Sequence, residues 1–288
     1  MITAAFLNGQ SDLYTALRSL GFGDDALPQI LAACDPQTRA RLLSVDQGFL
    51  RAIMRQNIGG SGAADAVRAY LAKATPAPIF QPDVAASPTL ALLTEGQHPD
   101  MPAFSDRSFD AWFAAKGVAY GLGTYCEKRS VYETPAFADA ASPERRTVHL
   151  GIDVFAPALT PVYAPLAGRV LYVTYNPDHL DYGNTLILQH DAGGVAFYTL
   201  YGHLAGTLPG LLKVGDAVEP GQLIAHLGDW HENGGWAAHL HFQIMTGMLE
   251  QRSGNFFGVG HESLLDVWQD ICIDPNLVLR INAEKFNL

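Results

Sequence analysis

Two short motifs in this sequence carry side chains that could hold a metal ion. They are His149-Leu150-Gly151-Ile152-Asp153 and His239-Leu240-His241, which a long stretch of chain separates. A catalytic zinc ion needs three protein ligands of the imidazole or carboxylate type and a fourth position for water, whereas a structural zinc site closes with four ligands, usually including thiolates. His149, Asp153 and one histidine of the second motif supply such an open set. The other histidine is then free for chemistry.

The spacing within each motif lets these side chains converge. Side chains of a strand alternate between its two faces, so His239 and His241 share one face. His149 and Asp153 are also an even number of residues apart, and residues 148–154 are predicted to be extended rather than helical. We therefore expect each pair to present its polar groups to one pocket.

Each motif alone also has an ordinary explanation. A His-x-His pair on a strand is more often solvated or hydrogen-bonded than bound to a metal, and His-x-x-x-Asp by itself is a weaker signal. The two motifs occur together, however, and a third histidine, His203, stands between them in Tyr201-Gly202-His203-Leu204. The combination argues against coincidence and favours the metal site.

Further motifs accompany these two in a fixed order along the chain. They are Thr160-Pro161-Val162-Tyr163-Ala164-Pro165, Gly183-Asn184, Tyr201-Gly202-His203-Leu204, Val214-Gly215-Asp216-Ala217-Val218, and the extension of the second motif to Phe242-Gln243-Ile244. In this order the sequence resembles the lysostaphin-type (LytM-like) zinc metallopeptidases, over about residues 145 to 246. In detail it is similar to the metallopeptidase modules found inside bacterial aminotransferase and kinase-like fusions.

The resemblance implies a role for each site residue. His149, Asp153 and His241 would bind one Zn²⁺ per chain, and His203 and His239 would be the catalytic imidazoles beside it. Water activated by the metal would attack a peptide carbonyl, with His239 as the base and His203 as the stabiliser of the oxyanion. The implied fold is α+β, with an antiparallel, barrel-like β-sheet core of the duplicated hybrid motif type.

Two features depart from the family pattern. The loop before His239 lacks the usual Thr-Gly and Gly-Pro pairs, and we predict that Asn233 and Trp236 of this loop contact substrate. The common glutamate after His-x-His-Phe is replaced by Gln243, which lies on the same strand face as His241. A neutral amide can still accept a hydrogen bond, so Gln243 is expected to support His241 from outside the metal site.

The segment upstream of the first motif is also predicted to lie near the site. Residues 120–137 have an irregular pattern, and Tyr125, Glu127 and Arg129 are polar enough to face a cleft and contact substrate. By analogy with latent relatives, this segment could cover the metal position. The alternative is an edge strand and loop held by an ordinary Glu-Arg pair.

The other histidines have simpler interpretations. His190 ends a predicted strand before the turn signal Asp191-Ala192-Gly193-Gly194 and is expected to be structural. His261-Glu262 begins like a helical His-Glu-x-x-His motif, but Leu265 stands where the second histidine is required, which excludes that mechanism. His98, His179 and His226 have no partner at a useful spacing.

The pattern along the chain predicts three regions. Residues 1–75 are expected to be helical, because apolar stripes occur at Leu13, Leu17 and Leu20 behind the capping pair Ser11-Asp12, at residues 42–53 and at residues 64–71. Pro76 and Pro78 then mark a linker. Residues 76–144 contain this linker, a short helix at 105–115 and the upstream segment. Residues 145–288 form the metallopeptidase domain, with a C-terminal helix at 264–271 and a tail.

Composition limits the possible partners and compartments. The chain has 288 residues, 48% of them hydrophobic, which suffices for one large domain or for a domain with a smaller one. A formal net charge of -11 with scattered Lys and Arg argues against nucleic-acid binding. Three widely spaced cysteines do not make a disulfide framework. Without a recognisable signal peptide or membrane span, we expect a cytoplasmic protein, with export by another route left open. The oligomeric state is not predicted.

These observations predict a zinc metalloendopeptidase, a hydrolase acting on peptidoglycan-type or other short flexible peptides. The alternative from another class is a catalytically silent peptide-binding or regulatory module. The presence of all five residues, His149, Asp153, His203, His239 and His241, favours the enzyme, because a silent module gives no reason to keep them.

Overall fold

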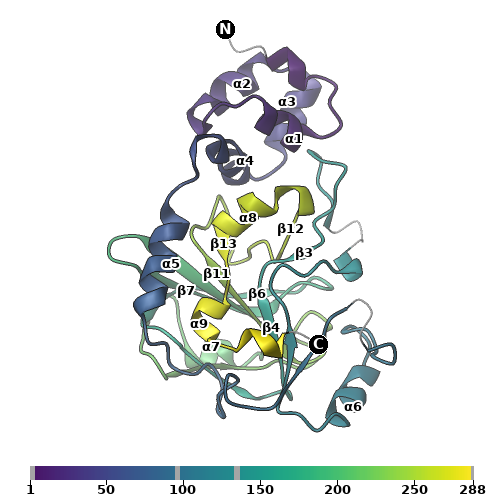
Figure 1. Ribbon diagram of the computed structural model, residues 1–288, viewed down its shortest axis with the longest axis vertical. Coiled ribbons are helices and arrows are strands. Elements are labelled where there is room, and N and C mark those ends of the chain that lie inside the picture. The colour runs from purple at the N-terminus through teal and green to yellow at the C-terminus, as the bar shows by residue number, and fades with distance from the viewer. Residues whose placement is uncertain (1–3, 95–97, 133–136, 287–288) are drawn as a thin grey trace.

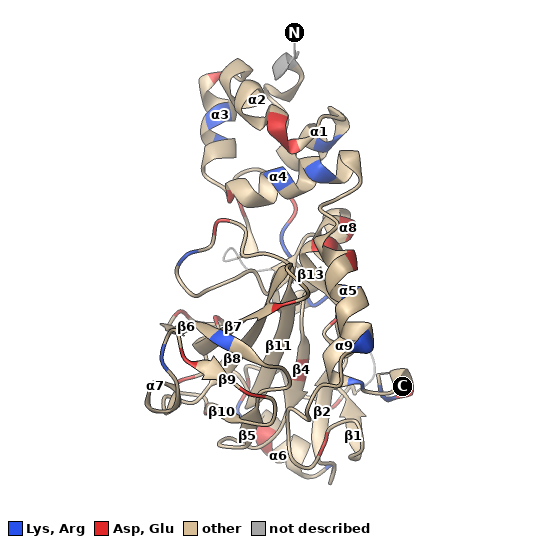
Figure 2. Cartoon of the chain, turned by 90° about the vertical axis from the view of Figure 1, so that its left-hand side faces the viewer, with Lys and Arg blue, Asp and Glu red and all other residues tan. Residues whose placement is uncertain are grey.

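The fold is α+β, with a lobe of short helices at one end of a mostly antiparallel sheet. The computed structural model describes residues 4–94, 98–132 and 137–286 (Figure 1). The lobe contains α1 to α4, and it stands on the side of the sheet where the C-terminal helix α8 lies, as a second view also shows (Figure 2). The helix α5 runs down along the sheet from this lobe.

Aspartate side chains cap the start of several N-terminal helices, and the last of these helices ends shortly before two prolines. Asp12, Asp35 and Asp46 each accept a hydrogen bond from a backbone N–H in the first turn of α1, α3 and α4. The helix α5 ends at Lys73, before the predicted linker prolines. The bounds are η1 Ala4–Leu7, α1 Leu13–Ser19, η2 Asp24–Ala26, α2 Leu27–Ala33, α3 Pro36–Leu43, α4 Gln47–Arg55, η3 Gln56–Ile58 and α5 Ala63–Lys73.

The apolar stripe at residues 42–53 belongs to two helices rather than to one. The helix α3 ends at Leu43 and α4 begins at Gln47. Between them the Asp46 carboxylate accepts a hydrogen bond from the Phe49 backbone N–H at 2.9 Å, which starts a new helix instead of continuing the old one.

A large sheet forms the body of the protein. Its strands follow the order β1-β2-β4-β11-β8-β7-β6-β9, with β13 paired to β11, and all pairs except β1 with β2 are antiparallel. The strands are β1 Thr89–Ala91, β2 Tyr120–Gly123, β4 Ile152–Phe155, β6 Gly168–Asn176, β7 Gly183–Asp191, β8 Ala196–Leu204, β9 Ala217–Val218, β11 His239–Met245 and β13 Cys272–Ile273. Two small pairs accompany it, β5 Pro161–Tyr163 with β10 Leu223–His226 and β3 Val148–His149 with β12 Val259–Gly260.

The register of three adjacent strands brings the two motifs together. In β11, His241 lies opposite Asp153 of β4 on one side and opposite Gly202 of β8 on the other. Cross-strand neighbours have Cβ atoms about 4.5–5.5 Å apart, so Asp153 and His241 must be in contact distance. His203 follows Gly202, and its backbone leaves the regular strand conformation with φ 63°, so that its ring lies 4.2 Å from that of His239.

The structure confirms one sequence prediction about extended segments and corrects another. Residues 148–154 are extended and not helical, in two strands, β3 and β4, which are separated at Leu150 and Gly151 and pair with different partners. Gly151 is required at this break, since a Cβ there would lie 2.6 Å from the His241 ring. Residues 120–123, predicted to be irregular, form β2, an internal strand of the large sheet between β1 and β4.

Short helices complete the chain. They are α6 Ser108–Ala114, η4 Ser130–Tyr132, α7 Leu208–Leu211, η6 Glu262–Leu264, α8 Leu265–Ile271, α9 Asn276–Leu279 and η7 Ala283–Lys285. The predicted helices at 105–115 and 264–271 correspond to α6 and α8. In the described part of the chain, every helix is too short or too polar to traverse a lipid bilayer.

The helical lobe and the sheet share a hydrophobic core. Phe49 of α4 stacks on Trp268 of α8 with ring centroids 4.3 Å apart, and both side chains are fully buried. The same cluster includes Leu17 of α1 and Leu200 of β8. Burying such side chains is the main favourable term in folding, so the lobe and the sheet stabilise each other.

Candidate active site

Three side chains from different strands form a compact cluster with free donor atoms. His149 of β3, Asp153 of β4 and His241 of β11 each offer one ligand atom, and these atoms lie within 4.8 Å of one another. Asp153 Oδ1 is 3.2 Å from His149 Nε2 and 3.1 Å from His241 Nδ1, and the two nitrogens are 3.0 Å apart. Ligands about 2.0–2.1 Å from a tetrahedral zinc ion are roughly 3.3 Å apart, so the donor set fits such an ion.

Hydrogen bonds on the far side of each imidazole determine which nitrogen faces the cluster. His149 Nδ1 lies 2.9 Å from the carbonyl oxygen of Thr124, and His241 Nε2 lies 2.9 Å from Gln243 Oε1. Both partners are acceptors, because the Gln243 amide nitrogen donates to the Phe257 carbonyl. Each outer nitrogen therefore carries the proton and each inner nitrogen keeps its lone pair for a metal. The predicted support of His241 by Gln243 is confirmed.

Two further imidazoles, those of His203 and His239, lie beside the cluster, and each has one ring nitrogen within hydrogen-bonding distance of a backbone carbonyl. His203 Nδ1 lies 2.8 Å from the Asn233 carbonyl oxygen, and His239 Nδ1 lies 2.7 Å from that of Ala237. Their rings are 4.2 Å apart. Burial lowers the pKa of His239 to about 4 and the pKa of His203 well below its ordinary value. Both rings are thus neutral, with Nε2 able to accept a proton.

The backbone of His203 adopts a conformation that needs support from its surroundings. Its φ is 63°, in the left-handed region that non-glycine residues rarely occupy. The N–H of His203 donates to the Tyr182 carbonyl at 2.7 Å, and its carbonyl accepts from the Gly228 N–H at 2.8 Å. Such locally strained residues tend to occur at functional sites, where the surrounding structure holds them in place.

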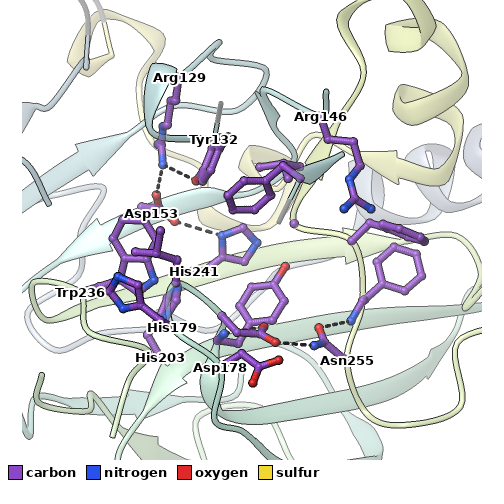
Figure 3. A pocket seen from close by; sticks show the side chains of 18 of the residues that line it. Arg129, Tyr132, Arg146, Asp153, Asp178, His179, His203, Trp236, His241 and Asn255 are labelled. Atoms are coloured by element: carbon purple, nitrogen blue, oxygen red, sulfur yellow. Dashed lines mark hydrogen bonds and ion pairs between the residues drawn. The ribbon is translucent and has the colours of Figure 1, made fainter. Parts of the chain in front are cut away.

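The cluster opens into a cavity of about 410 Å³ (Figure 3). Asp153, His203, His239 and His241 line it. Other lining residues come from the loop that joins β6 to β7, from residues after β11, and from residues 124–132 of the upstream segment. The cluster residues are at most 5% exposed, so a substrate must enter the cavity to reach them.

His179 is a cavity residue that the sequence did not indicate. It lies in the loop between β6 and β7 together with Asp178, Asp181 and Tyr182, all of which line the cavity. Its sequence neighbours carry no metal-binding spacing. Only the pairing of β7 with β8 brings this loop beside the two motifs.

The upstream segment contacts the cluster through Arg129. This side chain is 2% exposed, and its Nη1 donates to Asp153 Oδ2 at 2.7 Å. Its Nε donates to Glu127 Oε2 at 2.8 Å, so the Glu-Arg pair considered from the sequence is present. Glu127 in turn accepts hydrogen bonds from the backbone and hydroxyl of Thr94. The segment thus contacts Asp153 at Oδ2, the oxygen that does not face the imidazoles of the cluster.

Of the five residues predicted to contact substrate, two line the cavity and three do not. Arg129 and Trp236 line the cavity. Tyr125 and Glu127 are not among the lining residues; Tyr125 is directed to the Cys272 carbonyl, and Glu127 to Arg129 and Thr94. Direct substrate contact by these two residues is therefore not supported, because their polar atoms already have partners within the fold.

Asn233 shapes its loop instead of facing the cavity. The residue is fully buried, and its amide donates to the carbonyls of Gly228 and Trp236 while its side-chain oxygen accepts from the N–H groups of Gly235 and Trp236. All side-chain hydrogen-bonding groups are used, so Asn233 holds Trp236 and, through its carbonyl, His203. The substrate contact predicted for Asn233 is replaced by this role in the loop.

Comparison with known proteins shows that residues 147–253 match the family model "Peptidase family M23". A curated relative, "Uncharacterized lipoprotein YgeR" of Escherichia coli (strain K12), is 37% identical over 94 residues, which are 33% of this chain and 33% of that protein. The chain thus spans about a third of the length of that relative.

Solved structures of peptidases also resemble this chain. A zinc-containing peptidase from Vibrio cholerae is 30% identical, with 42% of this chain and 32% of that chain covered and a TM-score of 0.32. The catalytic domain of lysostaphin from Staphylococcus simulans is 22% identical, with 55% and 96% covered and a TM-score of 0.34. On the family match, residues 147–253 are similar to the peptidases of family M23.

Proposed function

We propose that this protein is a zinc-dependent metalloendopeptidase that hydrolyses peptide bonds in peptidoglycan-type or other short flexible peptides. The observation that carries the proposal is the convergence of His149 Nε2, Asp153 Oδ1 and His241 Nδ1, with the proton of each imidazole held on the outer side. Two nitrogens and one carboxylate oxygen are the ligands of a catalytic rather than a structural zinc site.

The residues around the cluster supply the remaining parts of a hydrolytic site. Zinc bound there would polarise the peptide carbonyl and lower the pKa of a water molecule towards neutrality. His239 Nε2, at 3.8 Å from Asp153 Oδ1, would accept the proton of the attacking water and return it to the leaving amine. His203, in a ring 4.2 Å from that of His239, would stabilise the developing charge on the carbonyl oxygen. Because its neutral ring carries the proton on Nδ1, Nε2 would have to take up a proton for this role.

The depth of the site argues for flexible substrates. The five site residues are nearly fully buried, and the cavity above them is only about 410 Å³ in volume. A folded protein surface cannot place a peptide bond there, whereas an extended peptide of a few residues can. The side chains of Trp236 and Tyr182 also line this cavity.

The test combines metal analysis with a search for cleaved substrates. Purified protein should contain one zinc ion per chain by elemental mass spectrometry, and it should cleave some members of a set of muropeptides and synthetic peptides detected by mass spectrometry. A chelator should abolish cleavage, and added zinc should restore it. Metal-free protein that binds peptides without cleaving them would instead support the silent binding module.

A further inference from the structure

We propose that Arg129 is the resident counter-charge of Asp153, which keeps the metal-binding carboxylate compensated and correctly turned before a metal ion arrives. The inference rests on the proposed function, in which Asp153 is a metal ligand. Arg129 lies outside residues 147–253, the part of the chain that matches the peptidase family. Nothing in the family match therefore assigns it a role.

Hydrogen bonds from several sides hold the Arg129 guanidinium against Asp153. Its Nη1 donates to Asp153 Oδ2 at 2.7 Å and lies 3.3 Å from the Tyr132 hydroxyl, as Figure 3 shows. Its Nε is held by Glu127 at 2.8 Å. Gly123 of β2 leaves room for the guanidinium, because a Cβ at this position would lie 2.5 Å from Nη2.

The two oxygens of Asp153 have different neighbours. Oδ1 faces the imidazoles of His149, His241 and His239 at 3.2, 3.1 and 3.8 Å. Oδ2 faces Arg129 alone among these groups, at 2.7 Å. Arg129 therefore leaves the metal-binding oxygen free, and it prevents the carboxylate from turning both oxygens toward the imidazoles. With zinc bound, the Asp153 carboxylate would have zinc at Oδ1 and the Arg129 guanidinium at Oδ2.

Burial makes the counter-charge necessary in the metal-free protein. The side chains of Arg129 and Asp153 are only 2% and 3% exposed. A buried carboxylate that loses its cationic partner is strongly destabilising, by roughly 10²- to 10⁴-fold in the folding equilibrium constant. Zinc would supply a replacement charge. Loss of Arg129 should therefore harm the metal-free protein more than the zinc-loaded protein.

This difference has a measurable consequence for zinc affinity. A ligand that stabilises the folded state more strongly must bind it more tightly, by linkage. Losing an ordinary hydrogen bond behind a metal ligand weakens metal binding by about 10- to 100-fold. The effect of the missing charge is larger than this and opposite in sign. Removing Arg129 should thus leave zinc affinity at least as high as in the wild type.

The first experiment compares thermal unfolding of the full chain with and without saturating zinc. Arg129→Met should lower the Tm of metal-free protein by about 10 °C and that of the zinc-loaded protein by less than half as much. Arg129→Lys, which keeps the charge, should recover part of the loss. Arg145→Met, at an exposed neighbouring arginine, is the control and should leave both Tm values unchanged. Zinc affinity is measured in parallel by competition with a fluorescent chelator.

The second experiment is a double-mutant cycle in metal-free protein. Every variant of the cycle carries Glu127→Gln, because Glu127 also pairs with Arg129. Asp153→Asn then removes the remaining buried charge, so Arg129→Met should cost far less in that background than with Asp153 present. If Arg129→Met alone does not fold, folding of the double variant supports the proposal, and failure of the double variant overturns it.

Equal Tm losses with and without zinc, or a zinc affinity that falls, also overturn the proposal and leave Arg129 as a structural residue. Wild-type protein that binds no zinc and cleaves no peptide is a different result. It overturns the proposed function, and with it the premise of this inference.

Discussion

At the scale of single residues, the proposed function divides the site into side chains that would hold the metal and side chains that would move protons. The donor atoms of His149, Asp153 and His241 point at one another, whereas His239 Nε2 lies farther from Asp153, at 3.8 Å. We predict that His239→Ala retains zinc but loses about 10²- to 10⁴-fold in kcat, the usual contribution of a general base. Asp153→Ala should lose both zinc and activity.

Zinc content and peptide turnover, measured on the same preparations, check this prediction. A His239→Ala variant as active as wild type would remove the assignment of His239 as the base. A variant that loses its zinc would make His239 a ligand.

His190 gives a separate prediction about pH. Its Nδ1 lies 2.7 Å from the Ala167 carbonyl oxygen and its Nε2 2.7 Å from the Thr199 hydroxyl, and burial lowers its pKa to about 4. The unfolded chain, with an ordinary histidine pKa of about 6.5, binds this proton more readily. The contribution of His190 to stability is thus fully present above pH 6.5 and is lost as pH falls towards 4.

His190→Gln, which keeps one donor and one acceptor, should therefore be less stable than wild type at pH 7 but less sensitive to acid. The free energy of unfolding from urea titrations should fall less steeply for the variant between pH 6 and 4.5, by up to about 1.4 kcal/mol per pH unit. Parallel curves for the two proteins would contradict this account.

Residue types and spacing alone indicated a candidate metal site of His149, Asp153 and one histidine of the second motif, because strand periodicity places His239 and His241 on one face. The choice of His241 came from the family resemblance. They were not enough to assign Arg129 or His179. The contact between Arg129 and Asp153 depends on β2 pairing with β4, and the place of His179 depends on a loop between two paired strands. For Asn233, the sequence could not distinguish a polar side chain that contacts a ligand from one that holds its own loop, and the structure shows hydrogen bonds within the loop.

At the scale of elements, Asp46 connects the helical lobe to the peptidase domain. Its carboxylate caps α4 through the Phe49 N–H at 2.9 Å and accepts a hydrogen bond from the Gln251 amide at 2.7 Å. We predict that Asp46→Ala lowers the free energy of unfolding by about 1–3 kcal/mol, because it removes a helix cap and a second, cross-lobe hydrogen bond. Urea denaturation measures this loss.

Asp65→Ala provides the matched control for the Asp46 variant. Asp65 lies in the first turn of α5 and is highly exposed, and its ion pair with Arg68 is a surface pair. Such pairs contribute little, so the change should stay within about 0.5 kcal/mol. An equal decrease in the free energy of unfolding for both variants would show that the contacts of Asp46 to α4 and Gln251 stabilise the protein no more than a surface ion pair does.

Boundaries of elements were predicted less well than their types. At Leu150 and Gly151 the chain passes from β3 to β4, and a glycine is needed there because a Cβ would lie 2.6 Å from the His241 ring. The division of residues 42–53 arises from one capping carboxylate. Both causes are tertiary or local polar contacts, which hydrophobic periodicity does not report.

At the scale of the whole molecule, the α+β fold with a helical N-terminal region followed from the sequence, but the way the two parts join did not. The apolar stripes of the helices showed that they must pack on something. They did not show that α4 packs on α8, from the other end of the chain, since no local pattern encodes a contact between residues so far apart. The division at residues 75 and 145 remains a prediction.

The shared core predicts that the helical lobe and the sheet unfold together. Phe49 of α4 contacts Trp268 at 4.3 Å and Phe257 of the cavity wall at 6.3 Å between ring centroids. Phe49→Ala should lower the free energy of unfolding by about 3–5 kcal/mol and shift one single transition, seen alike by tryptophan fluorescence and far-UV circular dichroism. Phe22→Ala, at a residue 39% exposed, should change stability by less than about 0.5 kcal/mol. Two separate transitions, of which only the first moves in Phe49→Ala, would show that the lobe folds independently of the peptidase domain.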